Sequence, residues 1–160
     1  MRMKFSKILV PLDGSILAEA ALWKAMEIAD GGTISLLRAA EAATLPGVDS
    51  PKAQVAAFRE SQEYLRRVVK RLNSRGMSNV EANVSYGPPT ASIVEAAHTQ
   101  KVDLIVMSTH GRSGLGRLVL GSVTESVLRG TTVPILIVRP EGAPVDAPVR
   151  AGPAGPSVRV

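Results

Sequence analysis

Four short apolar runs constrain the fold of this chain more than any other feature. They occupy residues 7–12, 33–37, 102–108 and 134–138 and are rich in β-branched side chains. Apolar residues follow one another in each run without strict alternation, which is typical of strands buried on both faces of a parallel sheet. A fifth run, 80–86, alternates polar and apolar residues, so we expect it near an edge of the sheet.

The segments between these runs have helical periodicity and recognisable ends. Ser15 is a good N-cap for the first helix, and Ser50, followed by proline, predicts the start of the second. A short third helix follows Thr90, and a fourth runs from Ser122 to about Gly130. The apolar positions of the second helix predict an inward face made of Val55, Phe58, Leu65, Val69 and Leu72.

Strands that alternate with helices along the whole chain predict an α/β fold. We expect an open, doubly wound, five-stranded parallel sheet with helices on both faces, of the Rossmann-like kind, because crossovers between parallel strands are right-handed. The connection 38–50 is longer than is usual in such units. Two interpretations of it stay open, a mobile flap over a site and a tolerated surface loop.

The chain length of 160 residues fits one compact domain. After Pro140 the composition changes to proline and glycine with little apolar bulk, which cannot offset the entropy of ordering. We therefore expect a domain over residues 1–140 and a flexible tail over 141–160.

Composition excludes several classes of protein. The chain has no cysteine, which excludes disulfides, cysteine-bound zinc, iron–sulfur clusters and thiol catalysis. The apolar run near the N-terminus is broken by Pro11 and Asp13 and lacks a cleavage signal, so it is typical of a strand rather than a signal peptide. No apolar stretch approaches the roughly 20 residues that cross a bilayer. We expect a soluble, cytoplasmic protein with no membrane partner.

Charge points to an anionic partner without identifying it. The 19 basic and 14 acidic residues give a net charge of +5. A solvated face balanced in part by Glu60 and Glu63 explains the basic second helix most simply, and attachment to nucleic acid or membrane is the alternative. An aromatic content of 3% disfavours single-stranded nucleic acid, which needs rings for base stacking. The basic residues of that helix and its end are Arg66, Arg67, Lys70, Arg71 and Arg75.

Polar residues follow two of the predicted strands, where an open α/β sheet places its ligand site. The first strand runs into Asp13, and the fourth runs into Ser108 and a segment rich in glycine and serine. Glycines let backbone N–H groups approach an anion, and the start of the fourth helix adds further N–H groups. The segment is too long for a Walker-type phosphate loop and lacks its Gly-Lys-Ser/Thr ending.

These residues resemble the universal stress protein family, and specifically its nucleotide-binding branch. The family motif G-x2-G-x9-G-(S/T) matches Ser108-x2-Gly111-x9-Gly121-Ser122, with serine in place of the first glycine. The segments ILVPLDGS, GPPT and DLIVMSTHG are also similar to family landmarks. The resemblance covers residues 5–139 and implies a Rossmann-like fold similar to that of the adenine nucleotide alpha hydrolases.

The resemblance also implies a ligand site. Pro11 and Asp13 would line the adenine or ribose, Ala39 would meet the base through its backbone, and Met107 would lie beneath the ribose. ATP would be the ligand, with Mg²⁺ or Mn²⁺ bridging its phosphates. A homodimer would form through the last strand, from Pro134 to Val138. The residues around the ribose and phosphates would be Ser108, Gly111, Arg112, Gly121, Ser122, Val123 and Thr124.

Together these features indicate an ATP-binding module that responds to nucleotide in a stress response, with slow ATP hydrolysis at most. The alternative is a dimeric interaction module whose pocket is vestigial, and Ser108 is its main support. A true enzyme is disfavoured because no dense set of carboxylates and no catalytic lysine accompanies the strand ends. His110 has no identifiable carboxylate partner, so we expect it to order the loop or contact phosphate rather than act as a base.

Overall fold

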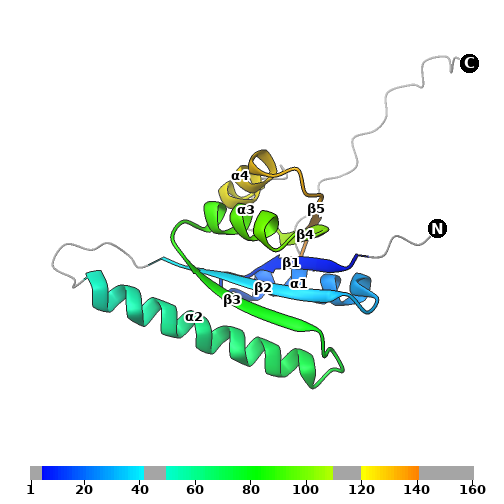
Figure 1. Cartoon of the computed structure of the whole chain (residues 1–160), viewed down its shortest axis with the longest axis horizontal. Coiled ribbons are helices and arrows are strands. Elements are labelled where there is room, and N and C mark those ends of the chain that lie inside the picture. The colour runs from blue at the N-terminus through cyan, green and yellow to red at the C-terminus, as the bar shows by residue number, and fades with distance from the viewer. Residues whose placement is uncertain (1–4, 42–49, 110–119, 141–160) are drawn as a thin grey trace, which may run out of the picture.

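The computed structural model describes residues 5–41, 50–109 and 120–140. Strands and helices alternate through these ranges, as the sequence predicts (Figure 1). The flap hypothesis at residues 42–49, the loop residues His110, Gly111 and Arg112, and the tail 141–160 lie outside the described residues. The elements are β1 (Lys7–Pro11), α1 (Ile16–Ala29), β2 (Thr33–Ala40), α2 (Ser50–Asn73), β3 (Val80–Tyr86), α3 (Pro89–Thr99), β4 (Leu104–Ser108), α4 (Ser122–Gly130) and β5 (Ile135–Val138).

The five strands form one parallel sheet in the order β3-β2-β1-β4-β5. The chain winds outward from β1 to β3, returns to β4 on the other side of β1, and continues to β5. This order confirms the predicted doubly wound fold, and it confirms that residues 80–86 form an edge strand. The winding direction reverses between β1 and β4, which is where open α/β sheets bind ligands.

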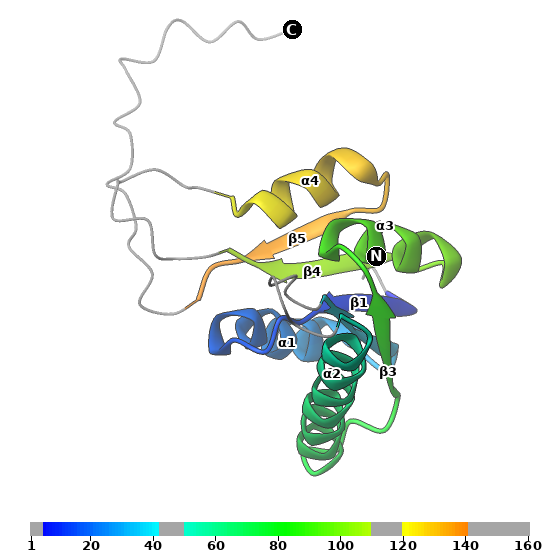
Figure 2. The same ribbon diagram turned by 90° about the vertical axis from the view of Figure 1, so that its left-hand side faces the viewer.

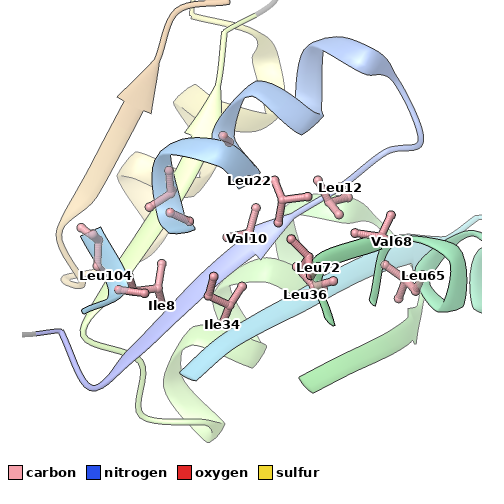
Figure 3. Close-up of a cluster of buried hydrophobic side chains, with 14 of the residues drawn as sticks. Ile8, Val10, Leu12, Leu22, Ile34, Leu36, Leu65, Val68, Leu72 and Leu104 are labelled. Atoms are coloured by element: carbon pink, nitrogen blue, oxygen red, sulfur yellow. The ribbon is translucent and has the colours of Figure 1, made fainter. Parts of the chain in front are cut away.

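Helices cover both faces of the sheet, with α1 and α2 on one face and α3 and α4 on the other (Figure 2). In β1, Ile8 and Val10 pack toward α1 and α2, whereas Leu9 belongs to the core beneath α3 and α4. Both sides of the strand are therefore buried, which explains the continuous apolar run. The first core also contains Leu22, Ile34, Leu36, Leu65, Val68, Leu72 and Leu104 (Figure 3).

The start of α1 agrees with the sequence prediction. Ser15 precedes the helix in an extended conformation, and its Oγ accepts a hydrogen bond from the backbone N–H of Ala18 at 3.1 Å. The helix ends at Ala29, and Asp30 follows it as the C-cap in a left-handed conformation with φ 39°.

The inward face predicted for α2 is wrong at Val55, which is 48% exposed. At 100° per residue, Val55 lies three turns before Arg66 and shares its exposed flank rather than the flank of Leu65. Tyr64 and Val68 are buried instead and complete the stripe with Leu65 and Leu72.

Strand β2 is longer than predicted, because Arg38, Ala39 and Ala40 belong to the strand rather than to the following loop. These residues pair with β3, with Arg38 opposite Val84 and Ala40 opposite Tyr86. The neighbouring strand therefore extends β2 beyond its apolar run.

The basic residues of α2 and of its C-terminal end are exposed, as predicted, but two of them also contact α1. The guanidinium of Arg71 lies 2.8 Å from Glu19 on α1 and 5.9 Å from the ring centre of Trp23, and Arg75 lies 4.3 Å from the same ring. Tyr64 donates a hydrogen bond to Glu19 at 3.1 Å, and burial, aided by this carboxylate, raises the pKa of Tyr64 above its usual range. Part of the basic cluster thus fastens α2 to α1.

Two glutamates were expected to balance the basic helix, and only one does so within the helix. Glu63 lies 3.8 Å from Arg67, but Glu60 pairs with Arg38 of β2 at 3.2 Å.

Within the described ranges, no helix combines the length and the apolar run that a membrane span requires.

Candidate functional site

The carboxyl ends of β1, β2 and β4 border a cavity of about 320 Å³. Leu37 and Met107, which line it, belong to the core beneath α3 and α4, so the cavity lies on that face of the sheet. The first residues of α3 and α4 complete its wall. The cavity therefore lies at the point where the winding direction of the chain reverses.

The turn after β1 is held from two sides. The carboxylate of Asp13 accepts a hydrogen bond from the backbone N–H of Ser15 at 2.8 Å, and Gly14 has φ 90°, a conformation that favours glycine. A Cβ added to Gly14 would lie 3.1 Å from Nη1 of Arg38. The guanidinium of Arg38 is itself held by Glu60 and lies 4.9 Å from the ring centre of Tyr64. This packing fixes Asp13 at the rim of the cavity.

The N-terminus of α4 forms the polar wall. Gly121 occupies the N-cap position and provides no side-chain hydrogen bond to the first turn. The first N–H groups of a helix have no partner within it, and the helix dipole makes this end attractive to anions. Ser122, Val123 and Thr124 bring these groups to the cavity.

Much of the rest of the described lining is apolar. Leu37 and Ala39 contribute from β2, Pro89 and Ile93 from α3, and Ala18 from α1. Such a surface suits a planar, weakly polar group, whereas the α4 end suits an anion. The two ends together fit an elongated ligand with an aromatic and an anionic part.

The structure brings nine of the predicted site residues together around this one cavity. Gly111 and Arg112 lie outside the described residues, and the role of every one of these residues in binding stays a prediction. The nine lining residues are Pro11, Asp13, Ala39, Met107, Ser108, Gly121, Ser122, Val123 and Thr124.

The sequence interpretation missed the apolar lining. Leu37 could have been found from Ala39, because residues two apart on a strand share a face. Pro89 and Ile93 had a weaker signal, the glycine-proline turn before the third helix. Leu12 and Ala18 had none, because only the folded turn after β1 brings them to the cavity.

The described lining offers little to a metal ion directly. No group of three or more histidine, aspartate or glutamate side chains occurs within metal-binding distance in the described part of the chain. Among the described lining residues, Asp13 is the one with an ionisable side chain.

Comparisons with known proteins agree with this architecture. The model of the universal stress protein family matches residues 4–139. A universal stress protein of Methanocaldococcus jannaschii is 33% identical over 141 residues, which are 84% of this chain and 82% of the relative. The structure of universal stress protein UspA from Lactobacillus plantarum has a TM-score of 0.73 at 25% identity and covers 86% of this chain and 99% of its own.

A universal stress protein in complex with cAMP has the same fold, with a TM-score of 0.65 at 24% identity over 85% of this chain and 98% of that chain. The match of the family model to nearly all the described residues, joined with the relative that is 33% identical, decides the assignment. The chain belongs to the universal stress protein family.

Proposed function

We propose that this universal stress protein binds an adenine nucleotide, ATP, in the cavity between β1 and β4 and acts as a nucleotide-responsive regulatory module in a stress response. One observation carries the proposal. An apolar slot, lined by residues of β2 and α3, and the N-terminus of α4, which has no side-chain cap, meet in one cavity where the winding direction of the chain reverses. A solved structure of the same fold is a complex with cAMP, which is consistent with a nucleotide as the ligand.

In this proposal the adenine lies in the apolar slot against Ala39, whose backbone meets the base, with Pro11 at its edge. The ribose lies near Asp13 and above Met107. The phosphates accept hydrogen bonds from the first N–H groups of α4, where the helix dipole favours their charge. Gly111 and Arg112 are assigned to the phosphates as well, on the family motif alone.

The lining fits a metal that is held mainly by the nucleotide. Mg²⁺ keeps several waters and binds proteins through one or two carboxylates together with substrate phosphates. We propose that Mg²⁺ or Mn²⁺ bridges the phosphate oxygens, since Asp13 is the one carboxylate in the described lining. The metal would offset phosphate charge that the helix end alone does not neutralise.

Ser108 replaces the first glycine of the family motif, and its position at the end of β4 tolerates the exchange in this proposal. It is half-buried and lines the cavity beside Met107. Its side chain is small, and its backbone atoms are available to a ribose whatever the side chain.

We propose slow hydrolysis at most, below about 1 per second, the low end of ordinary enzymes. Rapid hydrolysis needs a group that positions or activates water. In the described lining that task would fall to Asp13, whose Oδ1 already accepts a hydrogen bond from the backbone N–H of Ser15. The bound nucleotide is then a signal rather than a substrate.

We also propose a homodimer through β5, which is an edge strand of the sheet. The backbone carbonyl of Pro134 accepts a hydrogen bond from Ile105 of β4, and that of Val138 accepts one from Thr109, just after β4. By alternation, Ile135 and Ile137 direct their N–H and C=O groups outward. Pairing with a second copy of β5 would satisfy these groups and cover the apolar edge.

The alternative is a dimeric interaction module with a vestigial pocket, and the observation that favours it is Ser108 in place of glycine. A test of nucleotide binding distinguishes the two functions. We expect purified protein to release adenine nucleotide on denaturation, detected by chromatography, and calorimetry of the stripped protein to show one site for ATP with Mg²⁺. Protein that is free of nucleotide in repeated preparations and gives no calorimetric signal with Mg²⁺ or Mn²⁺ would leave the interaction module as the function.

A further inference from the structure

A second hollow, of about 410 Å³, lies between α2 and the edge strand β3. Leu65 and Val69 of α2 and Ala82 and Val84 of β3 provide its apolar lining. Arg66 and Lys70 line it from α2 as well. It shares no residue with the cavity between β1 and β4, which is on the other face of the sheet. We call it the β3 groove.

The backbone along the β3 groove is open to pairing. The carbonyl of Asn79 accepts a hydrogen bond from Ile34 of β2, and the N–H of Gly87 donates one to Ala40. These bonds direct the odd-numbered residues toward β2, so the N–H and C=O groups of Ala82 and Val84 point away from the sheet. The strand contains no proline or lysine, the residues that commonly block an edge.

The charge beside this edge is positive. Arg66 and Lys70 are exposed, one turn apart on α2, and neither forms an ion pair within the described ranges. The nearby acidic groups are already engaged, Glu63 with Arg67 at 3.8 Å and Glu81 with Lys7 at 2.6 Å. A ligand in the groove would therefore meet two unneutralised cations beside open backbone groups.

We propose that the β3 groove binds an extended acidic segment of a partner protein, which joins the sheet as a sixth strand beside β3. Main-chain hydrogen bonds would form with Ala82 and Val84, and alternate side chains of the segment would face α2. Acidic side chains at those positions would reach Arg66 and Lys70.

Two other occupants fit less well. The C-terminal 20 residues of this chain follow β5, at the opposite edge of the sheet, and carry two acidic and two basic residues. A nucleic acid has no backbone amides to pair with Ala82 and Val84, and none of the described groove residues is aromatic. An acidic peptide supplies both backbone groups that can pair with β3 and carboxylates that can reach Arg66 and Lys70.

The first test uses a fluorescein-labelled peptide of alternating valine and glutamate, followed by fluorescence anisotropy on the full chain. We expect saturable binding by about 1 mM peptide, and no binding of the counterpart with lysine in place of glutamate. The double variant Arg66→Ala, Lys70→Ala should weaken binding about tenfold, since each exposed ion pair contributes modestly. The double variant Lys24→Ala, Arg129→Ala has the same net charge, changes residues of α1 and α4 outside the groove, and should bind as the parent does.

The second test separates strand addition from simple charge attraction. Ala82→Pro removes an outward N–H at an edge, where proline is tolerated, and should abolish binding. A valine-glutamate peptide with N-methylated backbone amides keeps its charge, so its failure to bind the parent protein gives the same answer without any protein variant.

Four results would overturn the proposal: no saturable binding, equal loss in both double variants, undiminished binding of the N-methylated peptide, or tighter binding of an oligonucleotide of equal charge with the same dependence on Arg66 and Lys70. The groove variants should leave ATP binding unchanged, because Arg66, Lys70 and Ala82 do not line the nucleotide cavity. The two proposals can therefore fail separately.

Discussion

Replacing Gly121 with aspartate separates nucleotide binding from stability. Gly121 is the N-cap of α4, with φ −56° and ψ 150°, a backbone conformation that aspartate adopts without strain. Aspartate at an N-cap accepts hydrogen bonds from the N–H groups of the second or third helical residue, here Val123 or Thr124. The new carboxylate would therefore occupy the donors assigned to the phosphates.

The magnitude follows from the number of lost contacts. A hydrogen bond to a charged group contributes about 1.5–3 kcal/mol, so the loss of one or two such bonds, with charge repulsion added, costs about 3 kcal/mol or more. At about 1.4 kcal/mol per tenfold change, the dissociation constant for ATP should rise at least about 100-fold. The free energy of unfolding should stay level or rise by a few tenths of a kcal/mol, about the difference between aspartate and glycine as caps.

The assay is calorimetric titration with ATP and Mg²⁺, paired with urea unfolding of the same preparations. Ser78→Asp adds the same charge at an exposed position outside the cavity and should bind ATP as the parent does. Gly121→Ala lacks the charge and should retain binding within a few-fold while losing some stability. Tight ATP binding by a folded Gly121→Asp protein would refute the assignment of the phosphates to α4.

The remaining predictions concern the core, the α1–α2 contact and the edge at β5. Leu72→Ala should lower the free energy of unfolding by about 2–5 kcal/mol, whereas Val55→Ala should change it by less than about 0.5 kcal/mol; equal effects in urea unfolding would contradict the corrected inward face of α2. Tyr64→Phe should cost about 1 kcal/mol at neutral pH. Because the pKa of Tyr64 is raised in the fold, the parent should lose stability relative to Tyr64→Phe as the pH rises above about 10, and parallel stability curves would contradict that shift. Ile137→Pro removes an outward N–H of β5 and should yield a monomer by analytical ultracentrifugation, and an unchanged sedimentation coefficient would reject the β5 dimer.

The sheet and its order follow from local signals and general rules. The apolar runs fixed the strands because both faces of the sheet are buried, and Ser15 fixed the start of α1 through a local hydrogen bond. Right-handed crossovers then left few topologies. These features depend on residues close together in sequence, or on rules that hold for all parallel sheets.

The errors arose where distant residues decide the outcome. Strand β2 extends to Ala40 because β3 pairs with it. The basic residues of α2 are exposed as predicted, but the contacts of Arg71 with Glu19 and of Arg75 with Trp23 on α1 were missed. Val55 was misassigned because the predicted stripe was centred on Leu65 and Val69, whereas the buried stripe includes Tyr64 and Val68 and so lies farther round the helix from Val55. None of these interactions leaves a mark in the local sequence.

In the site, too, some features were predictable from local sequence and others depend on distant residues. The strand ends and the start of α4 were predictable, because parallel strands bring their carboxyl ends to one edge. The support of the Asp13 turn by Arg38 was not, because it depends on a guanidinium packed against Gly14 from the neighbouring strand.

The proposed function depends on an adenine nucleotide occupying the cavity between β1 and β4. The most direct measurement is a titration of isotopically labelled protein with ATP and Mg²⁺, observed through backbone amide resonances. We expect saturable shifts concentrated at Asp13, Ala39 and the first turn of α4, from Ser122 to Thr124. An absence of shifts at millimolar ATP, or shifts concentrated on the basic flank of α2 around Arg66 and Lys70, would contradict it.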